Sequence, residues 1–212
     1  LLDVQIGKNM ETKTQSPVMI YTEQTPNPES LKYVTNRMLY QGPADFRERE
    51  LANEWSPLAT ELFEMPFVKG VYISNNFVTV TKELNFNWED IMLKLKDFIK
   101  NYVQDGKTIL KDGFTEAMEA IEKERGVGME YSDEEAVIVK KIKELIETYV
   151  KPAVEMDGGN IEFERFDAGV VVVTLQGSCS GCPSSTVTLK AGIEGMLKRM
   201  VPEVTEVVAE MG

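Results

Sequence analysis

The sequence predicts an α+β fold: two small α/β sandwich domains, each a short sheet packed against two helices, joined by a flexible linker. Three observations predict it. The 212 residues are enough for two small domains. Each half alternates strand-like runs with helices whose apolar residues recur at three- and four-residue steps. Between the halves, residues 105–132 lack strand signals and contain four glycines, and so long a stretch is uncommon inside a compact domain.

The predicted limits are 17–104 for the N-terminal domain, 105–131 for the linker and 132–212 for the C-terminal domain. Residues 1–16 are expected to be a disordered or expression-derived tail, because 1–9 differ in character from the rest of the chain and Met10 is a candidate start residue.

The first half is predicted as strand, strand, helix, strand, strand and helix, at 18–23, 31–35, 56–63, 67–74, 77–81 and 88–102. The short helix begins at Ser56-Pro57, because serine is a good N-cap and proline suits the first helical position. Asn75-Asn76 predicts a hairpin turn, because asparagine tolerates a positive φ. No element is predicted between 36 and 55.

The second half is predicted as helix, strand, strand, helix and strand, at 132–149, 161–164, 170–175, 184–200 and 204–209. Ser132 and Glu135 have the spacing of a capping box at the start of the first helix. Pro152 is expected to kink or end that helix. Tight turns are predicted at 157–159 and 167–169, where glycines follow an aspartate.

The composition argues against several classes of protein. A formal net charge of −12 would repel nucleic acid phosphates and an anionic membrane surface. No apolar run approaches the roughly 20 residues that span a bilayer, and no signal segment opens the chain. Two cysteines do not make a disulfide scaffold, so a reducing, intracellular setting is expected.

Cys179 and Cys182 are the only cysteines, and the chain has no histidine. A Cys-x-x-Cys pair suits metal or iron–sulfur ligation, or a reversible disulfide. A four-thiolate site needs four sulfurs, and one chain supplies two. The pair therefore works alone as a redox couple, or two chains meet to complete a metal site.

The pair is predicted to lie between a strand end and a helix N-terminus. The partial positive charge of a helix N-terminus stabilises a thiolate, so the cysteine pKa values are expected to fall. Gly177 and Gly181 let backbone amides approach the sulfurs closely. The loop is thus expected to present two deprotonated sulfurs outward.

These motifs resemble a known family. The C-terminal half carries Asp157-Gly158-Gly159, Gly177-Ser178-Cys179-Ser180-Gly181-Cys182-Pro183-Ser184-Ser185 and Pro202-Glu203-Val204. This pattern resembles the NifU-like C-terminal domain. The first half carries Gln24-Thr25-Pro26-Asn27-Pro28, Ser56-Pro57-Leu58-Ala59 and Phe77-Val78-Thr79-Val80-Thr81-Lys82, and it resembles the N-terminal domain of Nfu-type proteins. Two small departures are Asn160, where an acidic residue is expected, and Ser178, where alanine is common.

The resemblance implies an iron–sulfur cluster scaffold or carrier, not an enzyme. It implies that Cys179 and Cys182 of each of two subunits ligate one bridging 4Fe–4S cluster, with a 2Fe–2S cluster as the alternative. The implied partners are upstream cluster assembly proteins, apo iron–sulfur proteins as recipients, and a second copy of the chain when the cluster is loaded. The implied location is the cytoplasm of a bacterium or the mitochondrial matrix of a eukaryote.

Two other functions use the same cysteines. A thiol–disulfide oxidoreductase is one, although thioredoxin-like sites lie in a βαβ order that a helix followed by a hairpin does not match. A zinc-bridged structural dimer is the other. Asp157 is expected to be a turn residue and not a general acid. The N-terminal domain lacks reactive residues, so we expect it to recognise a partner or to position the cysteine-bearing domain.

Overall fold

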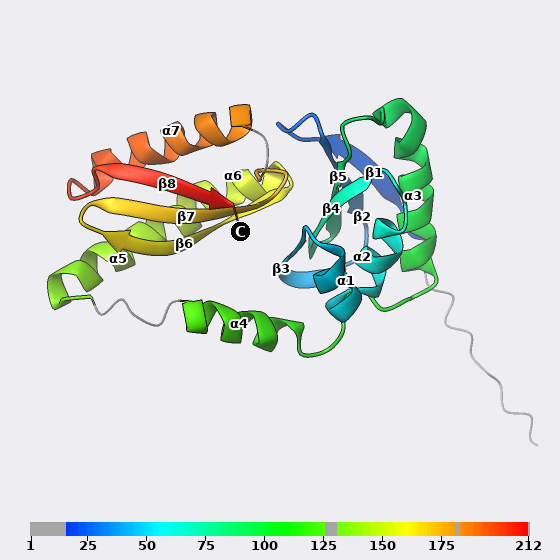
Figure 1. Ribbon diagram of the computed structural model, residues 1–212, viewed down its shortest axis with the longest axis horizontal. Helices are drawn as coiled ribbons and strands as arrows, with labels where there is room; N and C mark the ends of the chain where they lie inside the picture. The colour runs from blue at the N-terminus through cyan, green and yellow to red at the C-terminus, as the bar shows by residue number, and fades with distance from the viewer. Residues whose placement is uncertain (1–15, 126–130, 181–182, 212) are drawn as a thin grey trace, which may run out of the picture.

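The computed structural model describes residues 16–125, 131–180 and 183–211, which form two α+β domains (Figure 1). Each domain has one sheet, so the predicted fold class is confirmed. The predicted tail lies outside the described residues apart from Ser16, and so does Cys182. No helix within the described ranges is long and apolar enough to cross a membrane.

The N-terminal domain is a five-stranded antiparallel sheet with helices on one face. Its elements are β1 Ile20–Gln24, β2 Ser30–Thr35, β3 Tyr40–Phe46, α1 Arg49–Trp55, α2 Pro57–Phe63, β4 Val68–Asn75, β5 Phe77–Lys82 and α3 Trp88–Gln104. The strand order is β1-β2-β5-β4-β3. Its core is formed by one face of the sheet and the apolar stripes of the helices, including Tyr33, Leu58, Leu62, Ile73, Val78, Val80, Leu95 and Ile99.

Local sequence signals explain the elements that were predicted here. The Ser56 hydroxyl accepts a hydrogen bond from the Ala59 N–H at 3.1 Å, which confirms it as the N-cap of α2. Asn75 has a φ of +47° in the β4–β5 turn, which confirms the predicted hairpin.

The strand β3 and the helix α1 were not predicted. Gly42 and Pro43 interrupt the strand pattern of β3, and proline is tolerated there because β3 is an edge strand. The seven-residue α1 has no side-chain N-cap, so it carries no start signal in the sequence.

A further helix, α4 Phe114–Arg125, lies within the predicted linker segment. Its first residue, Phe114, is buried in the N-terminal core. The Phe114 ring centroid lies 5.9, 5.7 and 5.9 Å from those of Tyr40, Phe46 and Trp55. These contacts fasten the start of the segment to the N-terminal domain, while residues 126–130 lie outside the described ranges.

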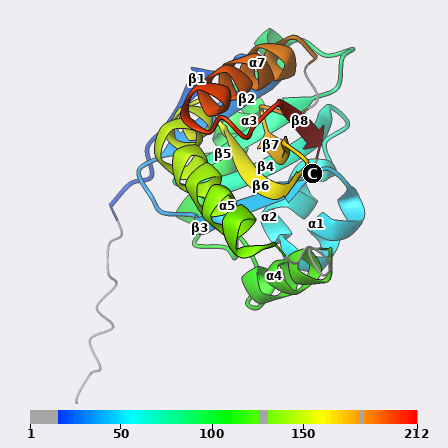
Figure 2. The ribbon, with the colours of Figure 1, turned by 90° about the vertical axis from the view of Figure 1, so that its left-hand side faces the viewer.

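The C-terminal domain is a three-stranded sheet covered on one face by helices (Figure 2). Its elements are α5 Asp133–Leu145, η1 Ile146–Val150, α6 Lys151–Met156, β6 Gly159–Asp167, β7 Val170–Gly177, α7 Pro183–Met200 and β8 Glu206–Met211. β6 and β7 form an antiparallel hairpin, and β8 lies parallel to β7 after the crossover through α7. This order places the cysteine-bearing loop between β7 and α7.

Pro152 does not end the first helix of this domain. The chain passes from α5 into one turn of π-helix, η1, and then into α6, where the proline lies in the first turn. Proline has no N–H to donate to the preceding turn, and a π-turn is one way a helix accommodates such a break.

The capping box at the start of α5 is complete. The Ser132 hydroxyl accepts a hydrogen bond from the Glu135 N–H at 3.3 Å, and a Glu135 carboxylate oxygen accepts one from the Ser132 N–H at 3.0 Å. These hydrogen bonds to Ser132 hold the pKa of Glu135 below its usual range.

We predict that Ser132→Ala lowers the free energy of unfolding of the C-terminal domain by about 1 kcal/mol, because an orphan helix donor loses its partner. In the parent chain, the stabilisation by Glu135 is present above its unfolded-state pKa and is lost as the pH falls through the lower folded-state pKa. Urea unfolding at several pH values, followed by circular dichroism, measures both effects. Glu144→Ala, at an exposed position on the same helix, is the control and should change little. Equal effects of the two variants would contradict the capping role.

Candidate metal centre

Cys179 lies in a tight loop after β7. Gly177 ends the strand with a φ of +64°, a conformation that favours glycine. The Ser180 N–H and hydroxyl both donate hydrogen bonds to the Gly177 carbonyl, at 3.2 and 2.8 Å. The Thr186 hydroxyl donates to the Cys179 carbonyl at 3.3 Å, which ties the loop to the first turns of α7. The backbone on both sides of Cys179 is therefore fixed.

The Cys179 side chain points into the core of its domain. It is 5% exposed and belongs to the same buried cluster as Ile161 and Leu175. Gly159 makes room for it, because a Cβ at that position would lie 2.8 Å from the Cys179 sulfur and 2.6 Å from the Gln176 carbonyl oxygen. The absence of a side chain at Gly159 is thus what admits the sulfur.

The turn between α6 and β6 holds the loop from the other side. The Ser178 hydroxyl donates to the Asp157 carbonyl, and the Ser178 N–H donates to the Gly158 carbonyl at 3.2 Å. The same hydroxyl lies 3.7 Å from the Cys179 sulfur. Ser178, which departs from the common alanine, therefore links the turn to the cysteine.

Burial raises the pKa of the Cys179 thiol to about 11; the hydrogen bond to Ser178 lowers the pKa, and the negative charge of Asp157 raises it further. The expectations of a lowered pKa and an outward-facing sulfur were therefore wrong for Cys179. The physical reason is that α7 begins at Pro183, four residues later, so burial outweighs the helix N-terminus.

The N-terminal domain reaches this end of the C-terminal domain. The Tyr72 ring packs against Gly177, where a Cβ would lie 2.9 Å from it. The Thr79 hydroxyl donates a hydrogen bond to the Gly158 carbonyl at 2.8 Å. The surroundings of the cysteine loop thus come from both domains.

Comparison with known proteins decides the family. A family model described as "Scaffold protein Nfu/NifU N terminal" matches residues 20–106, and one described as "NifU-like domain" matches residues 142–208. The human "NFU1 iron-sulfur cluster scaffold homolog, mitochondrial" is 38% identical over 189 residues, which are 88% of this chain and 70% of that protein. The chain belongs to the Nfu family of iron–sulfur cluster scaffold proteins.

Other Nfu proteins are similarly close. The Drosophila sechellia protein with the same name as the human one is 38% identical over 200 residues, which are 93% of this chain and 67% of that protein. The "NifU-like protein 4, mitochondrial" of Arabidopsis thaliana is 37% identical over 196 residues, which are 91% of this chain and 66% of that protein. The chain spans about two thirds of the length of these relatives. The resemblance to both Nfu domains is confirmed.

Of the two cysteines predicted as ligands in this Nfu protein, Cys179 is described, and Cys182 lies outside the described residues. Ligation by the pair stays a prediction. Within the described ranges, no group of three or more His, Cys, Asp or Glu side chains could hold a metal ion.

Two other residues singled out in the sequence have structural roles. Asp157 ends α6 at the predicted turn, and its pKa is raised by burial and lowered by the charge of Lys32. The Asn160 side-chain amide donates to the carboxylate of Glu162 and to the side-chain carbonyl of Gln176, both at 2.9 Å. Asn160 therefore contacts polar groups of the β6–β7 hairpin.

The N-terminal residues beside the loop were not predicted. Tyr72 and Thr79 alternate with core residues on their strands, a pattern that also fits a solvent-exposed face. Gly158 and Gly177 were the sequence signal for these contacts, because glycine often marks a place where another group approaches the backbone closely.

We predict that Gly159→Ala lowers the free energy of unfolding of the C-terminal domain by about 1–3 kcal/mol, because the new methyl group overlaps the Cys179 sulfur and a fixed carbonyl. Urea unfolding measures the change. Gly192→Ala is the matched control, since a Cβ there meets nothing within 4 Å and alanine suits the interior of α7; it should raise stability by roughly 0.5–1 kcal/mol. Similar effects of the two variants would contradict the packing described for Cys179.

We also predict that Cys179 in the metal-free protein reacts slowly with iodoacetamide at neutral pH. A pKa raised from 9.0 to about 11 lowers the thiolate fraction about a hundredfold, and only the thiolate reacts. The rate should rise with pH until about 11, and unfolding in urea should remove the protection. The Cys182→Ser variant isolates the Cys179 reaction for measurement by mass spectrometry. Reaction as fast in the folded as in the unfolded chain would contradict the buried thiol.

Proposed function

We propose that this Nfu protein carries an iron–sulfur cluster as cargo, bridged between two copies of the chain through Cys179 and Cys182, and transfers it to apo-proteins. The observation that carries the proposal is the ligand count. The chain has two cysteines and no histidine, whereas a 4Fe–4S cluster is held by four thiolates. Membership of a scaffold family supports the binding of an iron–sulfur cluster. The count of two cysteines supports a second chain as the source of the other two thiolates.

The bridged arrangement suits a carrier. Two chains together supply the full thiolate set, and separation of the chains removes half of the ligands at once. Release of the cluster is then coupled to dissociation of the two chains and does not require a closed site to be broken. The proposed role is that of a non-catalytic carrier between upstream assembly proteins and apo iron–sulfur proteins.

Cys179, as the structure describes it, does not fit the attacking cysteine of a thiol–disulfide oxidoreductase. Such enzymes need a cysteine that is accessible and largely thiolate near neutral pH. Cys179 is buried, and its pKa is raised to about 11. The loop also follows the β6–β7 hairpin, which differs from the βαβ order of a thioredoxin-like site.

The relatives named above carry the word mitochondrial in their names. Of the two locations considered from the sequence, we therefore propose the mitochondrial matrix for this chain.

We predict that Cys179→Ser and Cys182→Ser each abolish cluster binding, because each removes two of the four ligands of a bridged cluster. The parent chain, reconstituted with iron and sulfide under argon, should be brown and hold about two iron atoms and two sulfides per chain. Iron, sulfide and visible absorption are the measurements. Thr205→Ala is the control, since Thr205 contacts Gly169 at the opposite end of the β6–β7 hairpin, and it should keep the cluster.

Other results would favour the other functions. Insulin reduction by the iron-free parent chain, lost in both cysteine variants, would favour the oxidoreductase. A colourless dimer that binds zinc and no iron would favour the structural zinc bridge.

A further inference from the structure

The N-terminal sheet has a second face, opposite its own core, and the C-terminal domain covers part of it. Lys32, Tyr72 and Thr79 stand on this face and are 8%, 2% and 1% exposed. Tyr72 also packs with Val34 and Phe77 in an apolar cluster separate from both domain cores. Buried polar side chains require hydrogen-bond partners. The partner of Thr79 comes from the other domain. The Lys32 ammonium pairs with the Glu23 carboxylate of its own sheet at 3.2 Å and also with carbonyls of the other domain.

Lys32 and Thr79 bind the turn that holds the cysteine loop. The Lys32 ammonium donates to the carbonyls of Glu155 and Met156, at 3.2 and 3.0 Å. These carbonyls lie at the end of α6, where helical carbonyls lack intrahelical partners and attract a cation. The Thr79 hydroxyl donates to the carbonyl of Gly158, in the turn just after this helix end.

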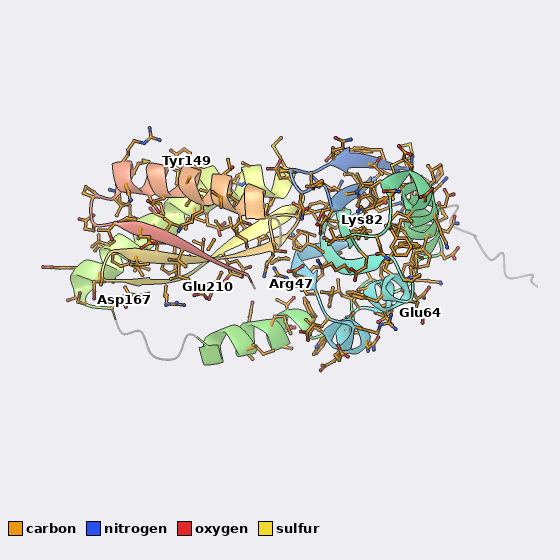
Figure 3. All side chains as sticks on the ribbon, turned by 45° about the horizontal axis from the view of Figure 1, so that its top comes forward. Arg47, Glu64, Lys82, Tyr149, Asp167 and Glu210 are labelled. Atoms are coloured by element: carbon orange, nitrogen blue, oxygen red, sulfur yellow. The ribbon has the colours of Figure 1, made fainter. Side chains whose placement is uncertain are left out.

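Arg47 and Asp45 bind the strand that leads into the cysteine loop. The Arg47 guanidinium donates to the Leu175 carbonyl at 2.8 Å and to the Asp45 carboxylate at 2.9 Å. Asp45 in turn accepts a hydrogen bond from the Gly177 N–H. Figure 3 shows Arg47 at the boundary between the two domains. The bonds therefore fall on the last residues of β7, next to Cys179.

The two surfaces also fit in shape. A Cβ at Gly158 would lie 2.7 Å from the Thr79 hydroxyl oxygen, and one at Gly177 would lie 2.9 Å from the Tyr72 ring. The N-terminal domain thus contacts bare backbone on both segments that flank Cys179. Beside this contact lies a cavity of about 340 Å³ whose wall includes Arg47 of the N-terminal domain and Ser180 of the cysteine loop.

We propose that the second face of the N-terminal sheet is a docking surface for the cysteine-bearing end of the C-terminal domain of the same chain, and that this contact must open before a second chain can complete a bridged cluster. The proposal rests on the two-chain site proposed above. The thiolates of both chains must bind the same cluster, so the second chain's loop must come close to the first. The N-terminal domain already occupies the flanks of that loop.

The test uses the full chain in which Lys32→Met and Arg47→Met are combined, which removes three hydrogen bonds to the C-terminal domain. Lys100→Met combined with Lys107→Met is the matched control, because it changes the charge equally on exposed residues of the N-terminal domain. Thr79→Arg is a second opening variant. The side chain at position 79 points away from the N-terminal core. An arginine there would overlap Gly158, and this steric clash should separate the domains.

Domain docking is measured on metal-free protein by NMR relaxation, which reports whether the two domains tumble together. Bridging is measured separately, as the rate of dimer formation during anaerobic reconstitution with iron and sulfide. We expect the two domains of the parent and control chains to tumble as one body and those of the two opening variants to tumble independently. The opening variants should form the dimer roughly tenfold faster, because each removed hydrogen bond shifts the docking equilibrium severalfold.

Independent tumbling in the parent chain, or continued joint tumbling in both opening variants, would overturn the docking. Opened domains with an unchanged rate of dimer formation would overturn the gating. If no chain forms a cluster-bridged dimer, the proposed function fails and gating falls with it, whereas docking is still decided by the metal-free measurement.

Discussion

The cysteine end of this protein depends on the close approach of two backbone segments, the turn at Gly158–Gly159 and the end of β7 at Gly177. Gly159 and Gly177 are paired across the β6–β7 ladder. Neither position has room for a Cβ, because carbonyl oxygens, the Cys179 sulfur and the Tyr72 ring fill the space. Interiors this dense transmit a change of one methyl group to their neighbours. The position of Cys179 therefore depends on close backbone contacts that only glycine allows at 159 and 177.

The same segments join the domain core to the domain interface. On one side they admit the Cys179 sulfur to the C-terminal core. On the other side the Gly158 carbonyl binds Thr79 of the N-terminal sheet, and Lys32 binds the Met156 carbonyl at the end of α6, just before the turn. Burial of the Cys179 sulfur and domain docking are thus coupled through a few residues. At neutral pH the Cys179 thiol, a proposed ligand, is protonated and buried in this state.

Much of the fold could be predicted from the sequence because its signals are local. The stripe of α3, the N-cap at Ser56 and the Asn75 turn each predict an element from neighbouring residues alone. The strand β3 was missed because Gly42 and Pro43 disrupt its pattern, and an edge position tolerates them. The family, too, could be recognised from one local run of residues around the cysteines.

The state of Cys179 could not be predicted, because it depends on contacts between distant segments. The sequence places the cysteine near a helix start, but the Gly159 contact that buries the sulfur comes from another strand. The contact of Lys32 with the C-terminal domain could not be predicted either, because a lysine that alternates with core residues on a strand usually faces water.

We propose that one chain supplies half of a cluster site. Native mass spectrometry of the protein, reconstituted with iron and sulfide under argon, tests this proposal. We expect a species of two chains with one 4Fe–4S cluster, and metal-free single chains as the remainder. A single chain that carries an intact cluster would contradict it.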